Sequence, residues 1–86
     1  MITTLSADIL GWIGSILLIS AYVLISRGKI TAKTPMYQWF NIIGSILLTI
    51  NTIHHGAYPS SAVNIVWFFI GLYFLRRIYV NSAKAE

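Results

Sequence analysis

The segment from Gln38 to His55 constrains the fold most, because it separates into two faces when it is drawn as a helix. At about 100° per residue, its polar and small side chains fall within an arc of roughly 160°. Large aliphatic side chains occupy the other side. The polar face comprises Gln38, Asn41, Gly44, Ser45, Thr49, Asn51, Thr52 and His55, and the apolar face comprises Ile42, Ile43, Ile46, Leu47, Ile50 and Ile53.

The composition decides which of these faces points inward. The chain has 86 residues, of which 57% are hydrophobic and 9% are charged, whereas about a quarter of the residues of a soluble domain are charged. So short a chain cannot bury this much apolar surface within itself. We therefore predict an integral membrane protein whose isoleucine face meets lipid and whose polar face meets protein or a water-filled cavity.

Three segments are long and apolar enough to be membrane-spanning helices, at about 9–26, 35–55 and 60–79. Ser6 is the expected N-cap of the first helix, with Asp8 in its first turn. The fold class that follows is an all-α membrane protein, a three-transmembrane-helix bundle that forms a single domain over residues 1–86.

Other residues are typical of helix ends. Gly28 follows the first span, as a residue that ends a helix does. Thr34 is the expected N-cap of the second span, and Pro35 suits its first turn. Pro59 is expected to begin the third span, which has Ser60 in its first turn.

The six basic residues lie in a loop and in a tail. This is not a basic face interleaved with aromatic residues, so the net charge of +4 does not indicate nucleic acid as a partner. The positive-inside rule instead places the first loop and the C-terminus in the cytoplasm and the N-terminus outside. The basic residues are Arg27, Lys29 and Lys33 in the loop and Arg76, Arg77 and Lys84 in the tail.

Small residues recur along one face of the first span and would allow another helix to approach closely. The hexapeptide at residues 13–18, Ile-Gly-Ser-Ile-Leu-Leu, recurs at 43–48 in the neighbouring antiparallel span. Shared packing demand or coincidence explains so short a repeat better than duplication does. The predicted close-approach face comprises Gly11, Gly14, Ser15, Leu18, Ala21 and Tyr22.

The chain offers little for catalysis or for metal binding. It has no cysteine, and its only acids, Asp8 and Glu86, lie at opposite ends of the sequence. His54 and His55 are adjacent on a helix, so their rings point about 100° apart and do not share one metal. We therefore predict neither an enzyme nor a metal or cofactor site.

Two interpretations of the polar face of the second span remain open. Its Ser, Thr and Asn side chains could bond across to neighbouring helices, or they could line a path for a solute. Asn41 and Asn51 each carry donors and acceptors that need partners at membrane depth. His55 shares this face, and its imidazole can change charge near neutral pH and make solute binding depend on pH. The bland interpretation, an ordinary interfacial helix end, is favoured for both histidines.

The third span adds Asn64 and Trp67. An amide beside an indole can hold a sugar or another polar solute, with the amide on hydroxyl groups and the ring on an apolar surface. The alternative is an interhelical bond from Asn64 and a tryptophan at the outer membrane boundary.

Several short motifs resemble those of known three-span membrane proteins. They are Ser26-Arg27-Gly28-Lys29, Tyr37-Gln38, Asn41-x-x-Gly44-Ser45, His55-Gly56-Ala57-Tyr58-Pro59-Ser60 and Asn64-x-x-Trp67. With three spans and a basic first loop, the chain resembles the SemiSWEETs, half-transporters of the PQ-loop clan. It is more similar still to an uncharacterised group of short bacterial three-span proteins placed near that clan.

The resemblance implies a homodimer of three-helix units in the bacterial inner membrane that moves sugars by alternating access. The asparagine of the family's third span corresponds to Asn64. The family's tryptophan in span two is replaced by Asn51 and Thr52, and the Pro-Gln hinge of span one is replaced by the segment at 20–22.

From the sequence we predict a homodimeric facilitator of a small polar solute, surrounded by membrane lipid. The alternative is a non-transporting scaffold or regulatory subunit that uses the polar face of span two as a docking surface. The residues expected to contact solute are Asn41, Asn51, Thr52, His55, Asn64 and Trp67.

Overall fold

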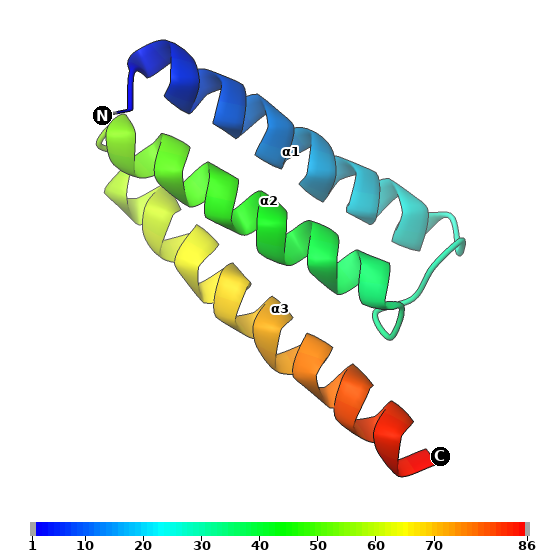
Figure 1. The fold of residues 1–86 in the computed structure, drawn as a ribbon. Helices are drawn as coiled ribbons and strands as arrows, with labels where there is room; N and C mark the ends of the chain where they lie inside the picture. The colour runs from blue at the N-terminus through cyan, green and yellow to red at the C-terminus, as the bar shows by residue number, and fades with distance from the viewer. Residues whose placement is uncertain (1, 86) are drawn as a thin grey trace.

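The computed structural model describes residues 2–85, with side chains described as far as Ser82. This part of the chain forms three helices, α1 (Thr4–Ser26), α2 (Pro35–His54) and α3 (Tyr58–Ala85) (Figure 1). They match the three segments expected from the sequence, although α1 begins earlier and α3 extends further. The Lys84 side chain of the expected basic tail, and Glu86, lie outside the described part.

The ends of the helices follow local chemistry. The N-cap of α1 is Thr3 rather than the expected Ser6, because the Thr3 hydroxyl accepts a hydrogen bond from the Ser6 backbone N–H at 3.1 Å. Asp8 consequently lies beyond the first turn. Thr34 is the N-cap of α2, as expected, with Pro35 at its first position. Gly28 follows α1 with a φ of 72°, a conformation that favours glycine.

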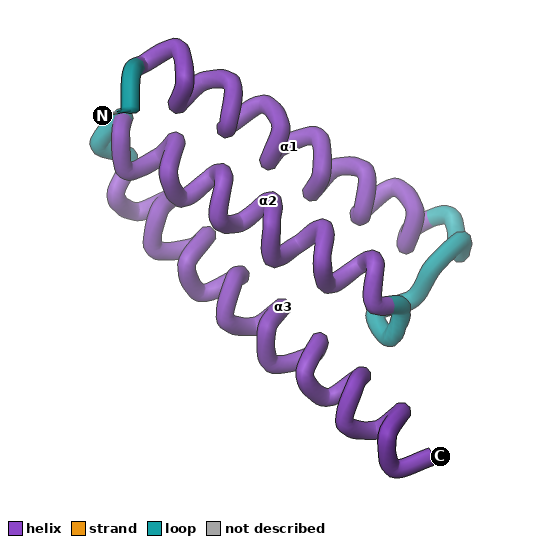
Figure 2. The backbone as a smooth tube through the Cα atoms, in the orientation of Figure 1, coloured by secondary structure: helices purple, strands orange, loops and turns teal. Residues whose placement is uncertain are grey.

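The α2 helix is the centre of the arrangement. Both α1 and α3 pack against it, and within the described residues these two outer helices do not contact each other. Figures 1 and 2 show α3 diverging from α2 toward the C-terminus. The faces of α2 that meet α1 and α3 are roughly 120° apart by helical projection. The three-helix bundle expected from the sequence is consequently an open one. An open arrangement leaves most large apolar side chains on the outside.

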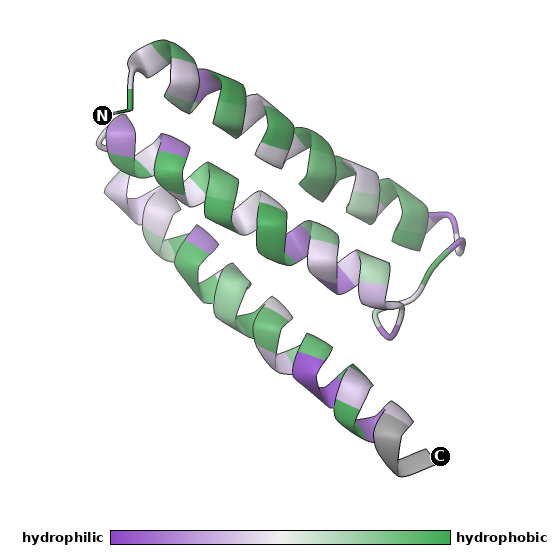
Figure 3. Ribbon diagram, in the orientation of Figure 1, coloured by the Kyte–Doolittle hydropathy of each residue, from purple (hydrophilic) through white to green (hydrophobic). Residues whose placement is uncertain are grey.

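The exposed surface is predominantly apolar. Two helical segments, Thr4–Ser26 and Tyr58–Ser82, are long and apolar enough to cross a membrane. Figure 3 shows that α2 carries more polar positions than α1 does. The expected outward face of α2 is largely present, except that Ile42 is buried, because its side chain fills the space beside Gly71 of α3. The exposed isoleucines of this face are Ile43, Ile46, Ile50 and Ile53.

The close approach of α1 to α2 occurs where the two copies of the hexapeptide meet. A Cβ atom on Gly14 would lie 2.8 Å from the carbonyl oxygen of Gly44, and one on Gly44 would lie 3.0 Å from that of Gly14. Leu18 packs over Gly44, and Leu48 packs over Gly14 in the same way. The repeat thus forms a crossing with local two-fold symmetry, which supports shared packing demand as its cause.

The small-residue face of α1 is confirmed at four of its positions and is wrong at Tyr22. Gly11, Gly14 and Ala21 are buried, and Leu18 packs on Gly44. Tyr22 is 70% exposed, because it lies at the edge of this face and points away from α2.

Candidate functional site

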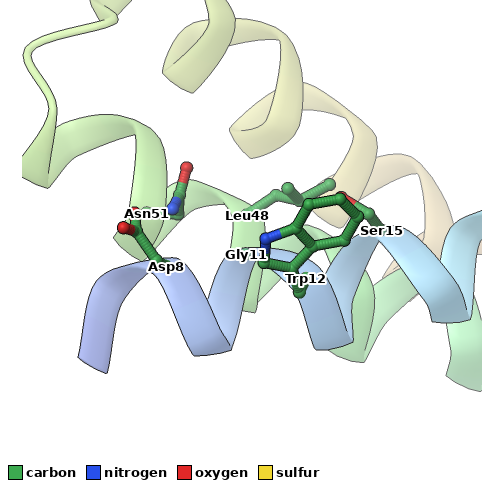
Figure 4. Close-up of a pocket in the computed structure, with 6 residues that line it drawn as sticks. All are labelled: Asp8, Gly11, Trp12, Ser15, Leu48 and Asn51. Carbon is green, nitrogen blue, oxygen red and sulfur yellow. The ribbon is translucent and has the colours of Figure 1, made fainter. Parts of the chain in front are cut away.

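A polar hollow of about 210 Å³ lies between the N-terminal half of α1 and the C-terminal half of α2. It combines a carboxylate, an amide, a hydroxyl and an indole, which are groups that hold small polar molecules. Figure 4 shows Asp8 and Asn51 at one end and the Trp12 ring near Ser15 at the other. We call it the polar hollow, and it is lined by Asp8, Gly11, Trp12, Ser15, Leu48 and Asn51.

Asn51 is positioned by α1. Its side-chain Nδ2 donates a hydrogen bond to the carbonyl oxygen of Ala7 at 2.8 Å. Gly11 makes room for the amide, because a Cβ atom there would lie 2.5 Å from Nδ2. The Asn51 Oδ1 atom makes no hydrogen bond with any described residue and remains available as an acceptor. Asn51 therefore fastens two helices and still offers one polar atom.

Two contacts from consecutive histidines close this end of the α1–α2 pair. The Nε2 atom of His55 lies 2.7 Å from Oδ1 of Asp8, and the side chains are 42% and 49% exposed. The Nε2 atom of His54 lies 3.1 Å from the hydroxyl of Thr4. The two rings contact each other edge to face, with their planes at 89°. A contact this exposed contributes less than about 1 kcal/mol, so its main effect is to orient the Asp8 carboxylate.

Other expected site residues lie on the α3 side of α2. The indole N–H of Trp67 donates to Oδ1 of Asn41 at 3.3 Å, and Nδ2 of Asn41 donates to the carbonyl oxygen of Tyr37 at 2.9 Å. These residues border a second hollow of about 190 Å³ whose lining is largely apolar. The hydroxyl of Thr52 accepts a bond from the Ser61 hydroxyl at 2.8 Å. Asn41, Trp67 and Thr52 thus join α2 to α3.

Asn64 stands apart from both groups. It is half-buried on α3, it borders neither hollow, and its side chain makes no hydrogen bond with a described residue. The structure does not pair it with Trp67, whose N–H goes to Asn41. Of the six residues expected to contact solute, only Asn51 lines the polar hollow, and His55 reaches it through Asp8.

Of the five lining residues that are not among the expected solute contacts, three carry a polar or aromatic side chain. Asp8, Trp12 and Ser15 are spaced by four and three residues, so they share one face of α1. That spacing was a usable signal. The signal is obscured because Asp8 also suits the expected first turn of the helix, and a tryptophan near the end of a span is typical of the membrane boundary.

The rest of the polar face of α2 is satisfied within the chain. The buried Gln38 donates to the carbonyl oxygen of Ala32 at 3.0 Å. The Thr49 hydroxyl donates to the carbonyl oxygen of Ser45 at 2.7 Å. Ser45 is the exception, because among the described side chains its hydroxyl is the one that is buried without a partner. This pattern supports the interhelical interpretation for most of the face.

Comparison with known proteins adds a family and no function. A protein-family model matches residues 7–82, and that family is uncharacterised. No curated protein and no solved structure matches the chain.

Proposed function

The chain belongs to the family whose model matches residues 7–82, and we propose that it is an integral membrane protein that facilitates the passage of a small polar solute. The observation that carries the proposal is a hollow with a carboxylate, an amide, a hydroxyl and an indole on a molecule whose exterior is predominantly apolar. Ionisable side chains within membrane-spanning segments face the protein interior or a water-filled cavity and mark the pathways of substrates or ions.

The apolar exterior supports insertion of all three helices. Large side chains are exposed along each helix, among them Ile16 on α1, Ile46 on α2 and Phe69 on α3. The α2 helix has 20 residues and is about 30 Å long, which matches the hydrocarbon thickness of a bilayer. Its lower hydropathy does not prevent insertion, because α1 and α3 cover much of its polar face.

The basic residues support one orientation. The loop before α2 and the C-terminal part of α3 lie at the same end of the molecule, and both contain arginine (Figure 3). The turn between α2 and α3 contains no lysine or arginine. By the positive-inside rule the loop is cytoplasmic, so the polar hollow lies toward the outer half of the membrane.

A second copy of the chain would complete the site. The polar hollow is open on one side, and Trp12 at its rim is 72% exposed. In a parallel homodimer, a partner packed against α1 or α2 would close this side and exclude lipid from the Asp8 carboxylate. The free acceptors of Asp8 and Asn51 favour a solute that carries hydrogen-bond donors, such as a polyol, a sugar or an amine.

Osmotic swelling of proteoliposomes tests this function. Vesicles with the reconstituted chain are mixed with glycerol, sorbitol, glucose, glycine or methylammonium, and light scattering follows solute entry. We expect one class to enter faster than in empty vesicles, and S15L to lose most of this excess by filling the hollow. S20L is the matched control, because Ser20 is on the same helix and does not line the hollow. Equal entry into loaded and empty vesicles for every solute contradicts the proposal.

Use of the polar face of α2 as a docking surface is the alternative. It needs side chains that are free to bind a partner, whereas Gln38, Asn41 and Thr52 are engaged within the chain. This supports the solute site over docking. A stoichiometric partner protein cross-linked to this face in native membranes would reverse the preference.

A further inference from the structure

We propose that the chain binds the headgroup of an anionic phospholipid in a basic hollow at the end opposite to the polar hollow. This hollow measures about 550 Å³ and lies between the α1–α2 loop and the C-terminal part of α3. The inference rests on the proposed membrane location and is independent of the solute. The residues that carry it are Lys33, Phe74, Arg77, Ile78, Asn81 and Ser82.

The loop side of the basic hollow is held in place by hydrogen bonds. Gln38, which is buried at the start of α2, donates to the carbonyl oxygen of Ala32 at 3.0 Å. The backbone N–H of Lys33 donates to the Thr31 hydroxyl at 3.2 Å. Lys33 thus projects from a fixed backbone, which lowers the entropy lost when its ammonium group binds a ligand.

The α3 side contributes an arginine held by neutral groups. An Nη atom of Arg77 donates to the Tyr73 hydroxyl at 3.2 Å, and the guanidinium carbon lies 5.9 Å from the centre of the Tyr73 ring. These contacts orient Arg77 without neutralising its charge. Asp8, the acidic residue that the structure describes, is paired with His55 near the other end of the molecule. The positive charge of the basic hollow therefore has no carboxylate beside it within the described residues.

The order of side chains along α3 matches the layers of a phospholipid. Phe74 and Ile78 are one turn apart and supply an apolar wall. Arg77 and Asn81 are also one turn apart and, with Ser82, supply donors nearer the C-terminus. A phosphate bound by Lys33 and Arg77 would leave acyl chains to run along the apolar wall toward the bilayer centre. Basic recesses on the cytoplasmic side of membrane proteins bind anionic headgroups in this way.

Native mass spectrometry of the purified full chain in a zwitterionic detergent tests the site. The chain is mixed with equal amounts of phosphatidylglycerol and phosphatidylcholine, and the ratio of bound lipids is measured. We expect a clear preference for phosphatidylglycerol, reduced about tenfold in K33Q/R77Q, which lacks two cations near the headgroup. The matched control is K29Q/R76Q, which removes the same charge from positions that do not line the basic hollow.

Two further arms separate the possible outcomes. Excess sn-glycerol 3-phosphate should leave the bound lipid in place, because it cannot use the Phe74 wall; displacement would mean a site for soluble phosphates and would overturn the lipid assignment. If K33Q/R77Q and K29Q/R76Q lost the preference for phosphatidylglycerol equally, the lipid assignment would also be overturned, because the net charge of the chain alone would then explain the preference. R77K keeps the positive charge and should retain the preference for phosphatidylglycerol. This variant keeps the proposal testable even if K33Q/R77Q does not fold.

Flotation with phosphatidylcholine vesicles distinguishes failure of this inference from failure of the membrane proposal. A chain that floats but shows no headgroup preference lacks the lipid site and keeps its membrane location. A chain that does not float contradicts the membrane location itself.

Discussion

At its crossing point, the α1–α2 contact brings backbone against backbone, whereas the α2–α3 contact is made by side chains. Gly14 and Gly44 bring the first pair together, with each glycine under a leucine from the other helix. The second pair is joined by hydrogen bonds such as those of Trp67 with Asn41 and of Ser61 with Thr52. A small-residue crossing fixes one distance and one angle, while side-chain bonds tolerate more variation. We infer that α1 and α2 form a rigid pair to which α3 is attached more loosely.

The two hollows fall on opposite sides of this division. The polar hollow lies on the rigid pair, where Gly11 and Asn51 fix its shape. The basic hollow lies between the α1–α2 loop and the C-terminal part of α3, in the region where the ribbon of α3 diverges from α2 (Figure 1). A site that selects a solute gains from rigidity, and a cleft that admits a lipid gains from divergence. The difference between the contacts therefore agrees with the two proposed uses.

The largest effect should come from adding one methyl group at the rigid crossing. In G14A the new Cβ would lie 2.8 Å from a backbone oxygen, which cannot move aside. In G71A the nearest atom is Cγ1 of the Ile42 side chain at 3.0 Å, which can rotate. Overpacking costs about 1–3 kcal/mol, and alanine regains up to about 1 kcal/mol of helix propensity.

We therefore expect G14A to lower the free energy of unfolding by about 2 kcal/mol and G71A to change it by less than about 1 kcal/mol. Titration of detergent micelles with dodecyl sulfate, followed by circular dichroism, measures both variants. A larger loss in G71A than in G14A would reverse the assignment of the rigid pair.

An intermediate effect is expected at the side-chain contact. W67F keeps an aromatic ring but removes the N–H that reaches Asn41, an amide that is buried in the structure. Leaving a buried acceptor without its donor costs about 1 kcal/mol. W12F is the control, because the Trp12 indole makes no hydrogen bond with a described residue and should be neutral for stability. Equal stability of W67F and the native chain would show that this bond does not hold α3.

The smallest effect should be a gain in stability. The Ser45 hydroxyl is fully buried and has no partner among the described residues, so S45A removes a desolvated polar group and should stabilise the fold by up to about 1 kcal/mol. S61A, which removes the bond to Thr52, should have the opposite sign. Loss of stability in S45A as large as that in S61A would mean that Ser45 has a partner.

Much of the fold could be predicted from the sequence, because it depends on local pattern. Hydropathy and the Gly28 and Pro35 signals placed the helices to within a few residues at most ends. The spacing of Gly11, Gly14 and Ala21 identified the face of α1 that meets α2. The predicted burial was wrong at the edges of helix faces. Tyr22 is exposed and Ile42 is buried, because a small rotation of a helix decides whether a residue at the edge of a face is covered.

The partners of the polar side chains could not be predicted, because they depend on how far each helix slides along its neighbour. Asn51 and Asn41 share a face of α2 in projection, yet one bonds to α1 and the other to α3. The faces that α1 and α3 cover are set by the crossing angles and not by the composition of α2. Asp8 and Trp12 join the site for the same reason, since only the register of α1 brings them beside Asn51.

Hydration of the polar hollow is the most direct test of the proposed solute site. The chain contains no cysteine, so the single variants S15C and I16C can be reconstituted in liposomes and treated with a membrane-impermeant methanethiosulfonate reagent, which needs a hydrated thiolate. Ser15 lines the hollow, and Ile16 is its neighbour on the exposed apolar surface. We predict rapid modification of S15C and little modification of I16C, with complete modification of both in dodecyl sulfate. Protection of S15C together with reaction of I16C would contradict the solute site.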